Sequence, residues 1–125
     1  MTTQTGKIAI VTGASAGIGA TVAERLAKDG YTVVVNYAGN TAAAEAIVTK
    51  IKAAGGQAIT AQADVANPDA VRRMFDSTET AFGGVDVLIN NDPYPGQGIA
   101  WPKHHRQRSR ARPRRDRARA NGGVI

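Results

Sequence analysis

Apolar residues in the first 91 positions gather in short runs, and these runs alternate with longer stretches of helical spacing. The runs are rich in Val, Ile and Ala and predict strands over residues 7–12, 31–37, 57–63 and 85–90. The intervening stretches predict helices over residues 16–29, 41–54 and 68–82. The expected apolar stripes of the three helices are Ile18, Val22 and Leu26; Ala43, Ile47 and Ile51; and Val71, Phe75, Thr78 and Phe82.

Capping residues support these limits. Asn40 or Thr41 is the expected N-cap of the second helix, and Asn67, followed by Pro68, is that of the third. A glycine follows each helix, where a left-handed residue commonly ends one.

The alternation of strands and helices with short links predicts an α/β fold. We expect a partial Rossmann-like, doubly wound parallel sheet with strand order 3-2-1-4. Its first two helices should cover one face and the third helix the other. A ligand crevice is then expected between the first and fourth strands, where the winding reverses.

Three glycines join the first strand to the first helix. They follow Thr12 as Gly13, Gly17 and Gly19. Glycine allows a tight reversal of the chain, a close approach of backbone N–H groups to a phosphate, and close packing of helix on strand. A diphosphate would lie at the positive end of the helix, so the turn predicts a dinucleotide ligand.

The spacing Thr12-Gly-x-x-x-Gly-Ile-Gly19 resembles the opening signature of the short-chain dehydrogenase/reductase family. Asp64-Val65 after the third strand is similar to that family's adenine-contacting pair, and Asn90-Asn91 to the start of its Asn-Asn-Ala-Gly motif. The resemblance covers residues 7–91 and implies the cofactor-binding half of an enzyme that transfers a hydride between NADP(H) and a carbonyl or alcohol. The cofactor-binding residues it implies are Thr12, Gly13, Ser15, Gly17, Ile18, Gly19, Asn36, Tyr37, Asp64, Val65 and Asn90.

The end of the second strand bears on the cofactor. An NAD site needs a carboxylate there to accept a hydrogen bond from the ribose 2′-hydroxyl, whereas Asn36-Tyr37 carries no charge. We therefore expect NADP, with NAD as the alternative, although no arginine follows nearby to pair with a 2′-phosphate. Tyr37 could instead simply stack or pack.

The catalytic group that the resemblance implies is absent. The family uses a Tyr followed four residues later by Lys, with a Ser upstream, to move the substrate proton. The chain has three tyrosines, and Val35, Thr41 and Gly98 stand four residues after them. We expect no catalytic residue and no activity from this chain, and the substrate of the family enzyme cannot be read from it.

Charge divides the chain near Asn91. Residues 1–91 carry seven Lys/Arg against eight Asp/Glu, whereas residues 92–125 carry nine against two. This Arg- and Pro-rich segment has little to bury and is expected to be disordered. It also begins inside the Asn-Asn motif, and 20 of its 34 residues are Arg, Pro, Ala or Gly, which have codons built from G and C alone. We therefore expect a truncated enzyme half over residues 1–91 and a frameshift product over 92–125.

Two rival interpretations remain. The chain could be a nucleotide-binding or regulatory module whose basic tail contacts nucleic acid; without such a role, the tail is expected to bind nucleic acid only non-specifically. Alternatively, the chain could have no function as written. The adjacent His104 and His105 lack a convergent third ligand, so no metal site is expected. With no cysteine and no apolar run near the roughly 18 residues of a membrane span, we expect a cytoplasmic protein without a membrane partner.

Overall fold

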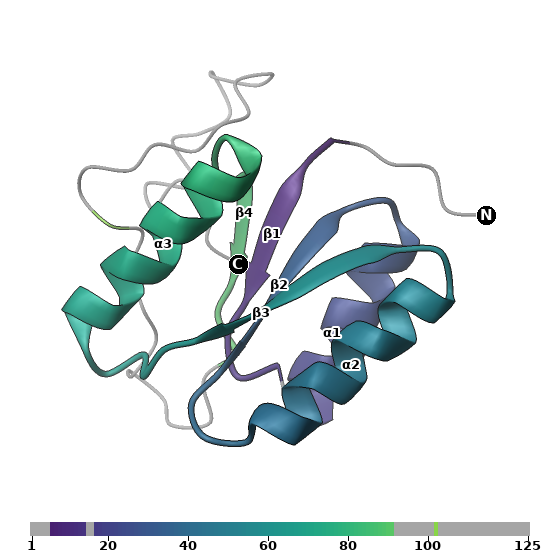
Figure 1. The fold of residues 1–125 in the computed structure, drawn as a ribbon, viewed down its shortest axis with the longest axis horizontal. Helices are drawn as coiled ribbons and strands as arrows, with labels where there is room; N and C mark the ends of the chain where they lie inside the picture. The colour runs from purple at the N-terminus through teal and green to yellow at the C-terminus, as the bar shows by residue number, and fades with distance from the viewer. Residues whose placement is uncertain (1–5, 15–16, 92–101, 103–125) are drawn as a thin grey trace.

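The computed structural model describes residues 6–14, 17–91 and 102. All seven elements expected from the sequence are present, and their ends differ from the expected ones by no more than two residues (Figure 1). The predicted basic segment and His104-His105 lie outside the described residues, apart from Pro102. The elements in chain order are β1 (Ile8–Val11), α1 (Gly17–Lys28), β2 (Thr32–Tyr37), α2 (Thr41–Ala53), β3 (Gln57–Gln62), α3 (Pro68–Phe82) and β4 (Val87–Ile89).

The four strands form one parallel sheet in the order β3-β2-β1-β4, which confirms the predicted order. β2 and β3 pair over six positions, from Thr32↔Gln57 to Tyr37↔Gln62. β4 pairs with β1 over only three, from Ala9↔Val87 to Val11↔Ile89. Among the described residues, β3 and β4 are therefore the edges of the sheet.

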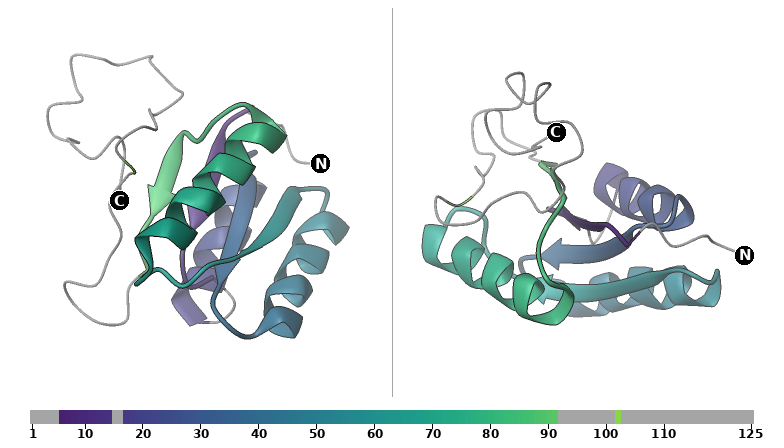
Figure 2. Two further views of the ribbon diagram at one scale, coloured as in Figure 1. Left: turned by 60° about the vertical axis from the view of Figure 1, so that its left-hand side comes forward. Right: turned by 90° about the horizontal axis from the view of Figure 1, so that it is seen from above.

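Alternating side chains on the strands divide the core into two layers. Ile8, Ile10 and Val34 point to the face that α3 covers, where Phe75 is fully buried. Side chains of the opposite parity, such as Val33 and Val35, pack beneath α1 and α2. Figure 1 shows α1 and α2 side by side, and the left view of Figure 2 shows α3 lying over the strands. The predicted division of the helices between the two faces is confirmed.

The packing face of α1 differs from the expected stripe. Ile18 is 75% exposed, whereas the buried positions are Gly19, Ala20, Ala23 and Ala27. Val22 and Leu26 are half-buried at the flank of this face. Small residues let a helix backbone approach the sheet closely, so they occupy the centre of the interface and the larger side chains are turned aside.

The helix ends follow the predicted caps. The Asn40 side-chain oxygen accepts from the Ala43 N–H at 3.0 Å, so Asn40 rather than Thr41 caps α2. The Asn67 oxygen accepts from two N–H groups at the start of α3. Gly83, with φ 88°, ends α3 in the left-handed conformation. These caps fix where each helix begins or ends beside the sheet.

Within the described part of the chain, no helix combines the length and the apolar character needed to cross a membrane.

Candidate functional site

The carboxyl ends of all four strands meet at one edge of the sheet. In-register parallel pairing brings the turn after β1 next to Tyr37 at the end of β2 and Ile89 at the end of β4. The chain order reverses between β1 and β4, and in open α/β sheets the strand ends at such a reversal are where ligands bind, so the turn that follows β1 is the expected ligand site.

The glycine turn after β1 has the conformation that its glycines were expected to allow. Gly13 has φ 59° and Gly17 has φ 62°, a region that residues with a Cβ rarely adopt. A Cβ at Gly19 would meet the Gly13 carbonyl oxygen and lie 2.6 Å from Asn91 Nδ2, whereas one at Gly17 would meet nothing within 4 Å. The turn is therefore closely packed beneath Gly19 and open at Gly17.

Thr12 and Asn91 join the turn to β4. The Thr12 hydroxyl donates to the Ile89 carbonyl at 3.3 Å and accepts from the Asn91 N–H at 2.9 Å. The Asn91 side-chain amide donates to the Gly13 carbonyl at 3.2 Å. Sequence reasoning did not include Asn91 among the site residues, although the Asn90-Asn91 pair directly after a predicted strand marked it. Asn90 is half-buried beside it.

Asn36 joins the turn to β2 and β3 and is only 1% exposed. Its side-chain oxygen accepts from the Gly13 N–H at 3.1 Å. Its amide nitrogen donates to the carbonyls of Ala61 and Ala63, each at 3.2 Å. The side chain is thus turned into the fold, away from the position at the end of β2 from which a ribose would be reached.

Tyr37 is also buried, and it packs in the layer beneath α1 and α2. Its hydroxyl accepts a hydrogen bond from the Thr41 hydroxyl at 3.3 Å. The exposed surface at this point is the turn that follows, residues 38–40, which leads into α2.

The remaining predicted residues flank the same edge. Asp64 is exposed, and its carboxylate accepts from the Ala66 N–H at 2.9 Å, which shapes the loop after β3. Val65 is half-buried against the α3 layer. Ile18 is exposed in the first turn of α1. Ser15 lies outside the described residues.

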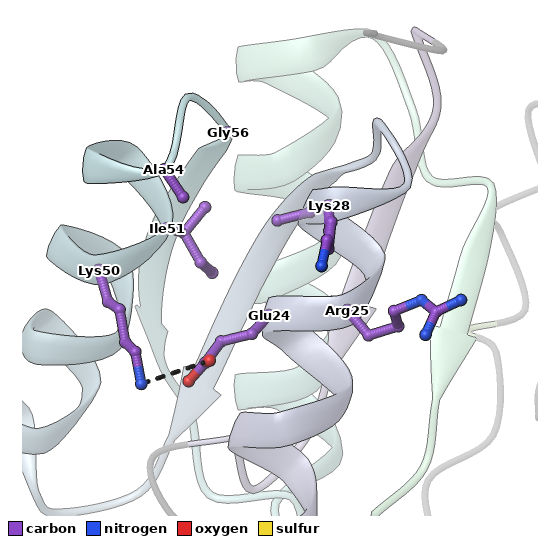
Figure 3. Close-up of a pocket in the computed structure, with 8 residues that line it drawn as sticks. Glu24, Arg25, Lys28, Lys50, Ile51, Ala54 and Gly56 are labelled. Atoms are coloured by element: carbon purple, nitrogen blue, oxygen red, sulfur yellow. Dashed lines mark ion pairs between the residues drawn. The ribbon is translucent and has the colours of Figure 1, made fainter. Parts of the chain in front are cut away.

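A hollow of about 520 Å³ lies elsewhere, between the C-terminal halves of α1 and α2. In it, Lys50 pairs with Glu24 at 3.5 Å, and Arg25, Lys28 and Ile51 stand nearby (Figure 3). This hollow lies at the opposite end of α1 from the glycine turn. The charged side chains in this hollow are of the kind found on any protein surface, so they do not mark it as a functional site.

A metal centre has no support in the described residues, which contain no group of three or more His, Cys, Asp or Glu side chains able to hold an ion.

Comparison with known proteins agrees with this geometry. The family model described as short chain dehydrogenase matches residues 7–105. The chain belongs to the short-chain dehydrogenase family. The resemblance expected from the glycine turn, Asp64-Val65 and Asn90-Asn91 is thereby confirmed, and the match extends past Asn91, where the motifs stop.

Individual relatives are similar over the same part of the chain. An oxidoreductase of Methylorubrum extorquens is 55% identical over 86 residues, which are 69% of this chain and 35% of that protein. A 3-oxoacyl-[acyl-carrier-protein] reductase of Staphylococcus epidermidis is 52% identical over 85 residues, 68% of this chain and 35% of that protein. A solved short-chain dehydrogenase from Burkholderia cenocepacia, in complex with NADP, is 49% identical with a TM-score of 0.67, covering 71% of this chain and 36% of that one.

This chain therefore spans about a third of the length of the curated relatives it matches.

Proposed function

We propose that this chain binds a nicotinamide dinucleotide at the glycine turn after β1. The observation that carries the proposal is the turn itself, in which Gly13 and Gly17 have positive φ and α1 begins at the switch between β1 and β4. The N–H groups in the first turn of a helix have no intrahelical acceptor, and their partial positive charge suits a pyrophosphate. The open space at Gly17 leaves room for this approach.

The residues that flank the turn lie at the carboxyl ends of the strands, and this position suggests a role for each of them. The backbone of Gly17, Ile18 and Gly19, with the Ser15 hydroxyl, would hold the pyrophosphate. Asp64 and Val65 would contact the adenine, and Asn90 the ribose on the β4 side.

Three other predicted residues would act indirectly. The Gly13 N–H donates to Asn36, and the Thr12 hydroxyl donates to the Ile89 carbonyl at the end of β4. These bonds shape the turn, so the proposed part of Thr12, Asn36 and Gly13 is to hold its backbone.

We propose NADP(H) as the preferred cofactor. No carboxylate stands at the end of β2, and the exposed turn of residues 38–40 leads straight into the positively polarised end of α2. A 2′-phosphate at this point would gain from that helix end and meet no negative side chain on β2. The relative from Burkholderia cenocepacia was solved with NADP, which agrees with this choice.

The activity proposed for the complete protein is hydride transfer between NADP(H) and a carbonyl or alcohol. The bound dinucleotide would supply the hydride to a carbonyl or accept it from an alcohol, and this chain's residues would bind and orient the dinucleotide. No Tyr in the 125 residues is followed four positions later by Lys. We therefore propose that the chain catalyses no oxidation or reduction on its own. Turnover that persists after contaminating host enzymes are removed would contradict this.

Calorimetric titration of the full chain with NADPH and with NADH tests the proposed cofactor. Favourable contact of a charge with a helix end contributes about 1 kcal/mol, so NADPH should bind about fivefold more tightly. Equal affinity would refute the NADP preference, and no binding of either would refute the dinucleotide site. Salt-dependent DNA binding that competes with NADPH would instead favour a regulatory module.

A further inference from the structure

Asn36 makes three hydrogen bonds to three separate parts of the site. It accepts from Gly13 in the glycine turn and donates to Ala61 in β3 and Ala63 just beyond it. We infer that Asn36 is a positioning residue for the dinucleotide, because it holds the pyrophosphate-binding turn at a fixed place relative to the adenine-binding loop after β3. The inference rests on the proposed function.

The match between Asn36 and its partners is specific to an amide of this length. The partners are one N–H and two carbonyls, and a carboxamide offers one acceptor oxygen and two N–H donors. An Asp of the same shape keeps the bond to the Gly13 N–H but turns a carboxylate oxygen toward the two carbonyls. An apolar residue leaves the buried Ala63 carbonyl and the part-buried Gly13 N–H and Ala61 carbonyl without this partner. For a buried group, that loss costs more than the bond itself contributes.

The backbone of Asn36 adds a fourth link. Its carbonyl accepts from the Ala14 N–H at 2.9 Å, so Asn36 holds two successive amides of the turn, Gly13 by its side chain and Ala14 by its main chain. On the other side, Thr12 and Asn91 fix the turn to β4. We call these three residues, Asn36, Thr12 and Asn91, the clamp of the glycine turn. Asn36 is the part of the clamp that comes from β2.

The same side chain reaches the residue that precedes the Asp64-Val65 loop. Ala63 accepts from Asn36 through its carbonyl, and its N–H donates to the Tyr37 carbonyl at 3.0 Å. A single residue therefore sets the spacing between the two segments proposed to hold the pyrophosphate and the adenine. A ligand that spans both gains affinity when that spacing is already fixed.

The test compares Asn36→Asp and Asn36→Ala with Thr32→Val in the full chain. Thr32 lies on the same strand and is also buried, and its hydroxyl donates to the Gln57 side chain at 3.1 Å, at the end of β2 away from the turn. All three variants remove side-chain hydrogen bonds between β2 and β3, but only the Asn36 variants disturb the clamp. Three quantities are measured: the urea midpoint, the affinity for NADPH, and amide hydrogen exchange at Gly13 without nucleotide.

We expect Asn36→Asp to bind NADPH about tenfold more weakly, since a misplaced buried polar group costs on the order of that factor. Thr32→Val should lower the urea midpoint and leave the affinity unchanged. Wild-type Gly13 should be protected from exchange, and the Asn36→Ala variant should lose that protection.

Unchanged affinity in Asn36→Asp, or an equal loss in Thr32→Val, overturns the inference. Fast exchange at Gly13 in the wild type overturns it as well, and that measurement holds even if the Asn36 variants do not fold. A wild-type chain that binds no NADPH refutes the proposed function, whereas the exchange at Gly13 still decides whether Asn36 holds the turn.

Discussion

Gly19→Ala should destabilise the protein although it replaces glycine within a helix. Alanine is favoured over glycine in a helix interior by about 1 kcal/mol, so a position with free space would gain stability. At Gly19 the added Cβ would meet the Gly13 carbonyl oxygen, lie 2.6 Å from Asn91 Nδ2 and 3.0 Å from the Ala14 Cα. Two of these neighbours are backbone atoms that cannot rotate away. Overpacking of this kind costs about 1–3 kcal/mol and occasionally more.

The net loss should therefore be up to about 2 kcal/mol, after the helix preference of alanine, about 1 kcal/mol, is subtracted from this overpacking cost. For a domain of this size each kcal/mol changes the melting temperature by about 4–8 °C. Because the displaced atoms belong to the glycine turn, NADPH affinity should fall together with stability.

Thermal melting followed by circular dichroism, with Gly39→Ala as the control, measures this effect. A Cβ at Gly39 meets nothing within 4 Å, and Gly39 is not among the glycines with positive φ, so Gly39→Ala should melt close to the wild type. A Gly19→Ala variant that is as stable as the wild type and binds NADPH equally well would refute the close packing of α1 on the turn.

Three further predictions follow from other parts of the chain. Phe75→Ala, which truncates a fully buried side chain beneath α3, should cost about 3–5 kcal/mol and abolish the cooperative urea transition or lower its midpoint severely; a small shift would contradict the packing of α3 on the sheet. Among the described residues β4 is an edge strand, and such an edge should make the chain associate as its concentration rises, so Val87→Lys should reduce that association in light scattering; a wild type that is monodisperse at all concentrations would contradict this. Translation of the gene in its other two forward frames from codon 88 should restore Ala-Gly after Asn90-Asn91 and, further on, Tyr-x-x-x-Lys; if neither frame does so, the arginine-rich segment is a selected basic tail.

Local patterns in the sequence were sufficient to predict the elements and their order. Apolar runs, helical spacing and caps such as Asn67 act over a few residues, and parallel crossovers leave few ways to arrange four strands. The glycine turn could be predicted for the same reason, because its conformation depends on Gly13 and Gly17 themselves.

The role of Asn36 could not be predicted in this way. Its partner Gly13 is 23 residues away and Ala63 is 27 away, so their meeting depends on how β1, β2 and β3 pair. From the sequence, an uncharged residue at the end of β2 indicated only that no carboxylate was present. Likewise, Ile18 was expected to pack because of its spacing, but the close approach of α1 leaves room only for small residues at the interface.

Amide chemical-shift mapping of the full chain during titration with NADPH tests the dinucleotide site most directly. The account predicts shifts at Gly13, Gly17 to Gly19, the turn of residues 38–40 and Asp64-Val65, and none in the hollow between α1 and α2 around Lys28 and Ile51. Shifts that gather in that hollow, or none at the glycine turn at saturating NADPH, would contradict it.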